Sequence, residues 1–502
     1  MSMRFRSEIS DLLEFIQSCL EEGQDLYIVG GGVRDVLLER ELKDLDFAMP
    51  EDPTSLARRV AHGLNAGFFV LDDDRHTARV VYEIADGETF PLDFVQFSGE
   101  SLSADLHNRD FTINAMAVPI RNRSQIIDPL GGQGDLRAKL LEVCQPNSLL
   151  GDPVRVLRGV RLAMQFNFSY AEGLDERMRR AASYLPQTSY ERQRDELFKI
   201  LEGPQPAKGM EHLHQFEVFE TLIPALVGQE TIPASPPHVL PLWEHTIRVV
   251  EDFDRILNAL ILDGSSYKST TWWMLSIIKA LSPFIEEIRA YFSQEVTSGR
   301  SKRGLALLGA LLHDIGKPMM MKADEDGRLH YYHHNTVGAD LAWEAAKRLK
   351  LSNAESEWVQ RMVRYHMVLL PLIIHESLPD RRMIYNFFNQ AGEVGVAIAM
   401  LSLADTTATY GEGLSEDKWG KAVQVSRAML SAWWQERETV VSPQLLLDGN
   451  DLQRLFSLNP GEQIGRLLAD LREAQASGEV RTEKDAIMFI KGQLPAFKEE
   501  KE

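Results

Sequence analysis

Two neighbouring acids, Asp44 and Asp46, are the residues of this chain best suited to chemistry. They open an apolar run that continues to Met49, a pattern typical of a β-strand. Residues two apart on a strand project from the same face, so both carboxylates point one way. Because like charges so close repel each other unless a divalent cation lies between them, the pair predicts a two-Mg²⁺ site for phosphoryl transfer. The alternative is a pair of solvated acids in a surface turn.

A third carboxylate is expected, since two residues rarely complete the oxygen shells of two Mg²⁺ ions. Asp93 is the best candidate, because it lies inside the strand-like run at residues 90–95 (FPLDFV). The predicted catalytic residues and magnesium ligands are therefore Asp44, Asp46 and Asp93.

A glycine-rich turn precedes these acids. Gly30 and Gly31 follow a short apolar run at residues 27–29 (YIV). Glycine permits positive φ and lets main-chain N–H groups approach an anion closely. The guanidinium of Arg34 could hold the same anion with a fork of hydrogen bonds. We therefore predict that the turn binds a triphosphate beside the acids.

These motifs, taken with others, resemble the class II tRNA nucleotidyltransferases and the related bacterial poly(A) polymerases. The matching segments follow the family's order within the first 202 residues: 30–46, 109–115 (RDFTINA), 128–136, 152–158 (DPVRVLR) and 191–197. The resemblance implies an α+β fold class, with a polymerase-β-like nucleotidyltransferase head of mixed sheet and helices followed by all-α neck, HD and tail domains. It also implies that Arg109, Asp110 and Asn114 complete the nucleotide pocket.

The choice of base is expected to depend on Asp152 and Arg155. A carboxylate accepts a hydrogen bond from an exocyclic amine and a guanidinium donates to a ring nitrogen or carbonyl, so the pair could recognise C or A without a template. In the family an acid usually precedes this Asp, and here Gly151 stands there. Alternatively, or in addition, Asp152 is a helix N-cap with Pro153 at the first helical position.

The net charge of −20 argues superficially against an RNA partner, but the charge is unevenly distributed. Between Gly151 and Glu202, nine basic residues face eight acidic ones. Arg158 and Arg161 belong to this arginine-rich stretch, which could contact nucleotide and RNA phosphates. A solvated helix face is the alternative. The neighbouring motifs favour RNA, and the resemblance implies tRNA, CTP and ATP as partners.

The expected product is a complete CCA end on tRNA. Only fifteen residues separate Asp93 from Arg109, whereas family members that build a whole CCA end commonly have a longer segment here. Addition of CC alone, or poly(A) synthesis, is therefore the alternative within the class, and addition of A alone is also open.

Histidines and acids in the second half form another candidate centre. Residues 311–317 (LLHDIGK) resemble the central signature of HD phosphohydrolases. His313 and Asp314 could bridge two divalent ions on one helix. The resemblance completes the ligand set with four residues from other segments: His245, His334, His366 and Asp405.

Mixed His and Asp ligands suit a second divalent transition metal, such as Mn²⁺, Ni²⁺ or Fe²⁺, whose identity stays open. The HD domain could repair tRNA ends by hydrolysis, or it could be structural. The rival from another class is a metal-dependent HD phosphodiesterase or phosphatase whose first half binds RNA.

A length of 502 residues predicts three or four domains. We expect a nucleotidyltransferase head (1–140), a base-recognising and RNA-binding neck (141–230), an HD metal domain (231–434) and a tRNA-binding tail (435–502). The two cysteines form no CxxC motif, which argues against a disulfide framework or a thiolate zinc site. With no apolar signal core and no run of about 18 apolar residues, a cytoplasmic protein without a membrane partner is predicted. The oligomeric state is not specified.

Overall fold

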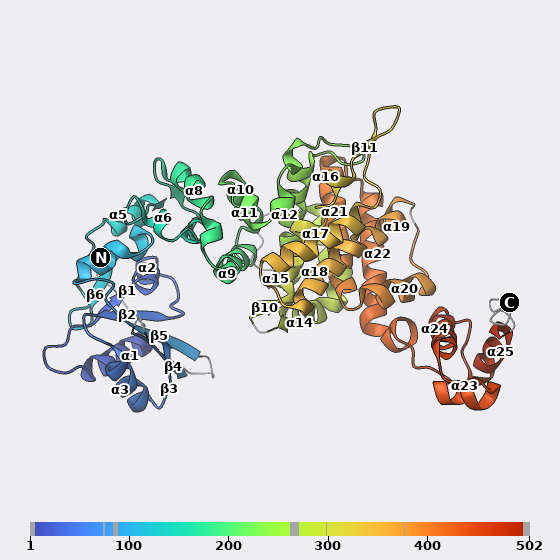
Figure 1. Cartoon of the computed structure of the whole chain (residues 1–502), viewed down its shortest axis with the longest axis horizontal. Coiled ribbons are helices and arrows are strands. Elements are labelled where there is room, and N and C mark those ends of the chain that lie inside the picture. The colour runs from blue at the N-terminus through green and yellow to red at the C-terminus, as the bar shows by residue number, and fades with distance from the viewer. Residues whose placement is uncertain are drawn as a thin grey trace. The chain divides into compact units, whose positions relative to one another are not determined.

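The computed structural model describes residues 6–73, 76–83, 89–261, 271–297, 299–375 and 377–494 (Figure 1). The chain divides into two compact units, one of residues 1–197 with 212–221 and one of residues 198–211 with 222–502. The four predicted domains and their three boundaries stay predictions.

A six-stranded mixed sheet forms the centre of the first unit, in the order β3-β4-β5-β2-β1-β6. Its strands are β1 (Tyr27–Val29), β2 (Leu45–Met49), β3 (Gly67–Asp72), β4 (Thr77–Glu83), β5 (Thr89–Gln96) and β6 (Ala117–Pro119). β2 and β5 are parallel, and the other described pairs within this sheet are antiparallel. Phe47 and Phe94 stack in the core with ring centroids 4.9 Å apart. Because side chains alternate along a strand, Asp46 and Asp93 face the other side.

Helices accompany this sheet and continue along the chain to the division between the two units, which falls within α9, α10 and α11. They are α1 (Ser7–Ser18), α2 (Gly31–Leu37), α3 (Thr54–Leu64), α4 (Leu102–Asn108), the 3₁₀ turn η2 (Thr112–Asn114), α5 (Gly132–Ala138), α6 (Ser148–Gly151), α7 (Arg155–Phe166), α8 (Leu174–Ala182), α9 (Tyr190–Leu201), α10 (Pro206–Gln215) and α11 (Phe219–Leu222), with the short parallel pair β7 (Leu140–Leu141) and β8 (Ser169–Tyr170). α7 buries Val156, Leu157 and Val160, which leaves its arginines at three-residue intervals on the other side.

The second unit is helical. Its helices are α12 (Leu242–Ile261), α13 (Trp272–Leu281), α14 (Ile285–Ser293), α15 (Lys302–Leu312), α16 (Lys317–Met320), α17 (His334–Arg348), α18 (Asn353–Tyr365), η8 (His366–Val368), α19 (Leu370–Ile374), α20 (Arg381–Ala391), α21 (Val394–Tyr410), η9 (Gly411–Gly413) and α22 (Glu416–Gln435), with the hairpins β9 (Glu295–Thr297)–β10 (Arg300–Ser301) and β11 (Lys322–Ala323)–β12 (Leu329–His330). α21 is buried on nearly all sides, because it is apolar around its whole circumference. α12, α18 and α22 pack against it. The predicted α+β fold class, a mixed-sheet head followed by helical domains, is confirmed.

The chain ends in a small helical group with its own core. After the π-helical turn η10 (Arg437–Val441) come α23 (Gly449–Phe456), α24 (Glu462–Ser477) and α25 (Glu483–Gln493). Leu467, Leu471 and Ile490 belong to the core of this group.

Within the described residues, no single helix has both the length and the apolarity to cross a membrane. α20 and the segment from Val394 to Gly413 meet those criteria only when they are counted together, across a bend of 109°.

Candidate functional sites

The sheet places two of the three predicted acids of the head at paired positions on neighbouring strands. Asp46 in β2 lies opposite Asp93 in β5 in the parallel register. Asp44 lies just before β2 and is exposed. Three sets of described side chains bring their ligand atoms within 4.8 Å of one another, all of them in the second unit. The head acids form no such set.

Burial and mutual repulsion act on these acids. Burial, with the charges of Asp44 and Asp93, raises the pKa of Asp46 to about 6. Partial desolvation beside the start of β2 and the charge of Asp93 also raise the pKa of Asp44. A divalent cation would favour the ionised carboxylates and offset their repulsion, so the donor set fits Mg²⁺.

Arg79, which no sequence motif indicates, fixes the third acid. Its Nε and Nη2 donate to the two carboxylate oxygens of Asp93, each at 2.7 Å. The antiparallel register of β4 and β5 places the two residues opposite each other. A fork of two charged hydrogen bonds fixes the orientation of the carboxylate. In the sequence, the signal for Arg79 is its place between two apolar residues of a strand-like run, Ala78 and Val80, both of which are buried.

The glycine-rich turn lies against the acids. Gly30 adopts φ +74°, and a Cβ there would lie 3.1 Å from both Arg109 Nη1 and Asp46 Oδ2. A side chain at Gly30 would therefore be strained and would crowd both charged groups. A Cβ at Gly31 would lie 3.3 Å from Arg34 Nη2. The structure thus places this turn, Arg109 and Asp46 together.

Arg34 is buried and already paired. Its Nε and Nη2 donate to the carboxylate of Asp35 at 2.9 and 3.0 Å, and its Nη1 donates to Asn114 Oδ1. The guanidinium carbon lies 4.5 Å from the ring centroid of Phe166. Arg34 therefore supports the wall of the turn, and an incoming triphosphate would share it with these partners.

Polar contacts connect this turn to α7. Asn114, bonded to Arg34, donates through Nδ2 to Asp110 Oδ1 at 3.1 Å. Asp110 is buried, and its other oxygen accepts from Arg158 Nη1 at 3.1 Å. Arg109 donates through Nε and Nη2 to Asp105, each at 3.0 Å, which leaves its Nη1 at the turn.

The predicted base-recognising pair lies at the start of α7. Asp152 Oδ2 accepts from Arg192 Nη2 at 2.7 Å and lies 3.8 Å from Arg155 Nε. Asp152 Oδ1 is buried without a hydrogen-bond partner among the described residues. Arg155 donates to the carbonyls of Asn108 and Arg109, each at 3.0 Å. One carboxylate oxygen of Asp152 is thus unpaired among the described residues.

The N-cap interpretation of Asp152 is wrong. α7 begins at Arg155, and its N-cap residue is Val154, which makes no side-chain cap. Pro153 therefore precedes the helix instead of opening it. The main chain makes a turn here, with the amide of Arg155 donating to the carbonyl of Asp152 at 3.0 Å.

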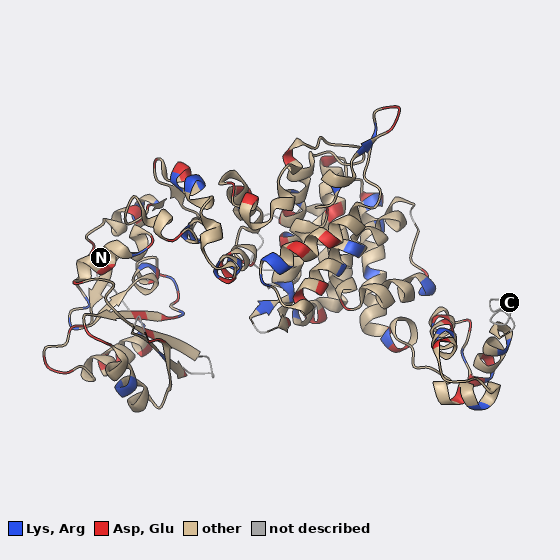
Figure 2. Ribbon diagram, in the orientation of Figure 1, with Lys and Arg blue, Asp and Glu red and all other residues tan. Residues whose placement is uncertain are grey.

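The arginines of α7 are partly neutralised. Arg161 Nε donates to Glu196 Oε2 at 2.7 Å, and Arg158 Nε lies 3.7 Å from Glu196 Oε1. Figure 2 shows basic and acidic residues side by side along α8 as well. The arginine-rich stretch is therefore a mixed surface, on which Arg158 keeps nearly half of its side chain exposed, 46%.

In the second unit, the structure brings all six predicted HD residues together around Asp314. Oδ1 of Asp314 lies 3.3 Å from His334 Nε2 and 3.6 Å from His366 Nε2. Oδ2 lies 3.2 Å from His313 Nε2 and 3.7 Å from His245 Nε2. The His245 Nε2 in turn lies 3.2 Å from Asp405 Oδ1. The two oxygens of Asp314 thus face two different groups of ligands.

Backbone carbonyls orient three of these histidines. Nδ1 of His313, His334 and His366 lies 2.7–2.8 Å from the carbonyls of Ala310, Tyr331 and Val363, respectively. A carbonyl can only accept, so each Nδ1 carries the proton and each Nε2 keeps its lone pair. His313 Nε2 and both nitrogens of His245 are buried without hydrogen-bond partners in the described part of the chain. Such donor atoms fit divalent transition ions.

Two further residues adjoin this centre that the sequence did not reveal. His238 can join His245 and Asp314 as a ligand set, and its Nε2 lies 3.2 Å from Lys317 Nζ. Lys317 Nζ lies 2.5 Å from Asp314 Oδ2. Burial, aided by Lys317, lowers the pKa of His238 to about 4. Although burial alone would raise it, His313 and Lys317 hold the pKa of Asp314 well below its ordinary value.

Four family models match the chain. The poly(A) polymerase head domain matches residues 26–142, and the RNA- and SrmB-binding site of polymerase A matches 167–228. The HD domain matches 271–384, and tRNA nucleotidyltransferase domain 2 matches 336–490.

Curated relatives match the chain over most of its length. It is 29% identical to the A-adding tRNA nucleotidyltransferase of Deinococcus radiodurans, over 92% of this chain and 94% of the relative. It is 28% identical to the CC-adding tRNA nucleotidyltransferase of Geobacter sulfurreducens, over 93% and 92%.

Solved structures also match. A CCA-adding enzyme with ATP gives a TM-score of 0.65 at 20% identity, over 98% of this chain and 96% of that one. The Thermotoga maritima CCA-adding enzyme complexed with tRNA gives 0.59 at 21% identity, over 98% and 97%. At such identities the structural likeness shows a shared fold.

Proposed function

The chain belongs to the class II tRNA nucleotidyltransferase and poly(A) polymerase family and includes an HD domain, and on this basis we propose that it adds CCA to the 3′ end of tRNA from CTP and ATP. The observation that carries the proposal is the register of Asp46 and Asp93 beside the Gly30 turn, within the segment that matches the polymerase head. Relatives solved with CTP, ATP and tRNA support these partners. The proposed site of action is the cytoplasm, where these partners occur.

The residues of the head have distinct roles in this proposal. Mg²⁺ held by Asp44, Asp46 and Asp93 would lower the pKa of the RNA 3′-hydroxyl and neutralise the pyrophosphate that leaves. Arg79 keeps the carboxylate of Asp93 in one orientation. Arg109 Nη1 and the main chain at Gly30 border the place proposed for the triphosphate.

Base choice is proposed to depend on the free oxygen of Asp152. This buried acceptor, without a partner in the described residues, suits the exocyclic amine that cytosine and adenine share. Arg192 and Arg155 hold the other oxygen and the adjacent main chain. Uracil offers a carbonyl where cytosine offers the amine, so it would place two acceptors against each other.

Addition of only part of the CCA end is the second candidate, and two observations favour it. The relatives matched over most of their length are named as A-adding or CC-adding enzymes. The short segment between Asp93 and Arg109 is ordered, because α4 fills much of it and Ser101 caps this helix.

The test presents tRNAs lacking three nucleotides, or only the terminal A, to the protein with Mg²⁺ and with CTP, ATP or both. Growth of the shorter tRNA by three nucleotides supports CCA addition. Growth that stops after two supports CC addition, and extension of only the longer tRNA supports A addition. Long tails would favour a poly(A) polymerase, and no growth would overturn the transferase proposal.

We propose that the HD centre binds two divalent transition ions and hydrolyses phosphate esters at RNA ends. The split of the ligands between the two oxygens of Asp314, and the buried nitrogens without partners, support two ions. Metal-depleted protein would be supplied with Mn²⁺, Ni²⁺ or Fe²⁺ and offered 2′,3′-cyclic nucleotides. Hydrolysis with at least one ion is expected, and a null result with every ion would leave a structural HD domain. Hydrolysis without any nucleotide addition would instead favour the HD hydrolase whose first half only binds RNA.

A further inference from the structure

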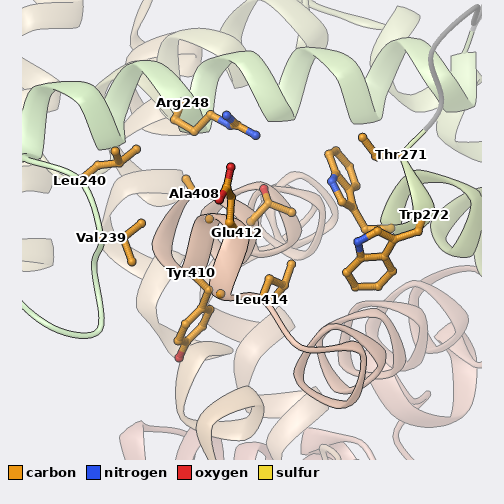
Figure 3. A pocket seen from close by; sticks show the side chains of 13 residues that line it. Val239, Leu240, Arg248, Thr271, Trp272, Ala408, Tyr410, Glu412 and Leu414 are labelled. Carbon is orange, nitrogen blue, oxygen red and sulfur yellow. The ribbon is translucent and has the colours of Figure 1, made fainter.

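A pocket adjoins the HD centre, between α12, the start of α13 and the end of α21 (Figure 3). Its volume is about 620 Å³, within the range of small-ligand sites. Nothing described so far uses it.

Residues of the pocket and of the metal centre lie on the same two helices, α12 and α21, and in the segment that precedes α12. Arg248 in the pocket lies one turn beyond His245 on α12, and Ala408 lies one turn beyond Asp405 on α21. Val239 in the pocket directly follows His238. A ligand in this pocket would thus lie about one helical turn from the HD centre, a separation comparable to that between the base and the phosphate of one nucleotide.

An aromatic side chain borders the pocket. Trp272 is 45% exposed, although tryptophan is usually well buried, and it lies across the hollow from Val239 (Figure 3). Exposed aromatic rings beside a cavity suit stacking against a nucleobase.

Two opposite charges, Arg248 and Glu412, line the pocket without pairing with each other, although Arg248 pairs with Asp252 and Glu251. The side chains of Arg248 and Glu412 extend toward each other in Figure 3, yet no ion pair within 4.0 Å joins them in the described structure. Arg248 is anchored through Nε to the buried Asp252 at 2.8 Å. A carboxylate that accepts and a guanidinium that donates complement a base with an exocyclic amine beside a ring nitrogen.

We propose that this pocket binds adenine or cytosine of an RNA 3′-terminal nucleotide while its phosphate lies at the HD centre. The inference rests on the proposed hydrolase function and gives it a substrate class, a base-bearing RNA end instead of any phosphate ester. With a 2′,3′-cyclic phosphate, water adds to phosphorus, one bond from phosphorus to a ribose oxygen breaks, and that oxygen takes the proton.

Base binding can be measured without hydrolysis. All eight tryptophans lie beyond residue 242, so the fluorescence of the head contributes nothing to the signal. Adenosine and cytidine should bind more tightly than uridine, as shown by quenching of the tryptophan fluorescence at lower nucleoside concentrations. Glu412→Gln should weaken the binding of adenosine about tenfold and abolish the preference for adenosine over uridine. Glu344→Gln, an exposed acid on α17, is the matched control and should change neither. Unchanged affinity in Glu412→Gln, or no quenching by any nucleoside, would overturn the pocket assignment.

Hydrolysis separates this inference from the proposal beneath it. Adenosine 2′,3′-cyclic phosphate and ethylene phosphate both contain a cyclic phosphodiester, but only the first has a base. Trp272→Leu and Glu412→Gln should raise KM about tenfold for the nucleotide and leave ethylene phosphate unaffected. If wild-type protein hydrolyses neither ester, the hydrolase proposal fails and the fluorescence titration still decides base binding. If the variants hydrolyse the nucleotide normally, only the base pocket is contradicted.

Discussion

Asp46 and Asp93 lie directly opposite each other on the parallel strands β2 and β5. Arg79 donates two hydrogen bonds to Asp93, while no described residue holds Asp46 in such a fork, and Asp46 is buried beside the charges of Asp44 and Asp93. The three acids are therefore only partly compensated by Arg79 and Arg109 beside the Gly30 turn. A divalent cation is the group that would balance the remaining negative charge.

The burial of Asp46 and its repulsion by the other two acids predict that removing its charge stabilises the head. The pKa of Asp46 is raised to about 6 in the folded protein, so the stabilisation from its protonation is full below pH 3.8 and is lost as pH rises through about 6. At pH 8 in EDTA, Asp46→Asn should stabilise the head by about 1–3 kcal/mol. The gain should shrink as the pH falls toward 4. Scanning calorimetry of the head transition measures it.

Asp52 supplies the control for that experiment. Its hydrogen bond to Thr54 lowers its pKa, so Asp52→Asn should not stabilise the head at pH 8. Added Mg²⁺ should raise the melting temperature of wild-type protein and not that of Asp46→Asn. If Asp46→Asn lowered the melting temperature at pH 8, the charge of this carboxylate would not be destabilising.

Arg79 is expected to tune metal use through Asp93. Without its fork, Asp93 can rotate, so Arg79→Met should raise the Mg²⁺ concentration for half-maximal CTP incorporation about tenfold. Arg58→Met, which removes an arginine stacked on Phe68 away from the acids, is the control. The same Mg²⁺ dependence in both variants would assign Arg79 a structural role only.

Asp152 is expected to control which base enters. Removing its free oxygen in Asp152→Ala should lower kcat/KM for CTP about 10- to 100-fold and increase the relative use of UTP. Competition between labelled CTP and UTP measures the ratio. Glu176→Gln on α8 should leave it unchanged, because that residue is exposed on another helix. A variant that loses rate while keeping its preference would argue that Asp152 only supports the fold.

Adjacent histidines test the HD centre. His334 is buried beside Asp314, whereas His333 is exposed. His334→Ala should lose at least one of two bound Mn²⁺ equivalents, and His333→Ala should keep both. Elemental analysis after loading and desalting provides the count. Equal metal contents in the two variants would contradict the ligand assignment, and addition to tRNA should persist in both.

Local sequence patterns predicted much of this arrangement. Asp46 and Asp93 each lie in a short apolar run, so their strands could be predicted, whereas their positions opposite each other depend on the register of β2 and β5. His313 and Asp314 belong to a contiguous signature that directly follows the apolar, buried helix α15, although the expectation that both lie on the helix is wrong, because α15 ends at Leu312. Such signals depend only on neighbours in the chain.

Other features depend on contacts that no local pattern encodes. The role of Arg79 requires the register between β4 and β5, and the role of His238 requires its segment to pass beside Lys317. The start of α7 was mispredicted because capping residues favour a helix beginning at Pro153, whereas Arg155 is fixed instead by carbonyls from residues 108 and 109.

The most direct test measures CTP incorporation into tRNA that lacks its last three nucleotides, with Mg²⁺, for wild-type protein and for Asp44→Ala and Asp46→Ala. Loss of metal-bound charge stabilisation should lower incorporation on the order of 1,000-fold or more in both variants, while hydrolysis at the HD centre continues. Incorporation at the wild-type rate in either variant would contradict the assignment of these acids to the reaction.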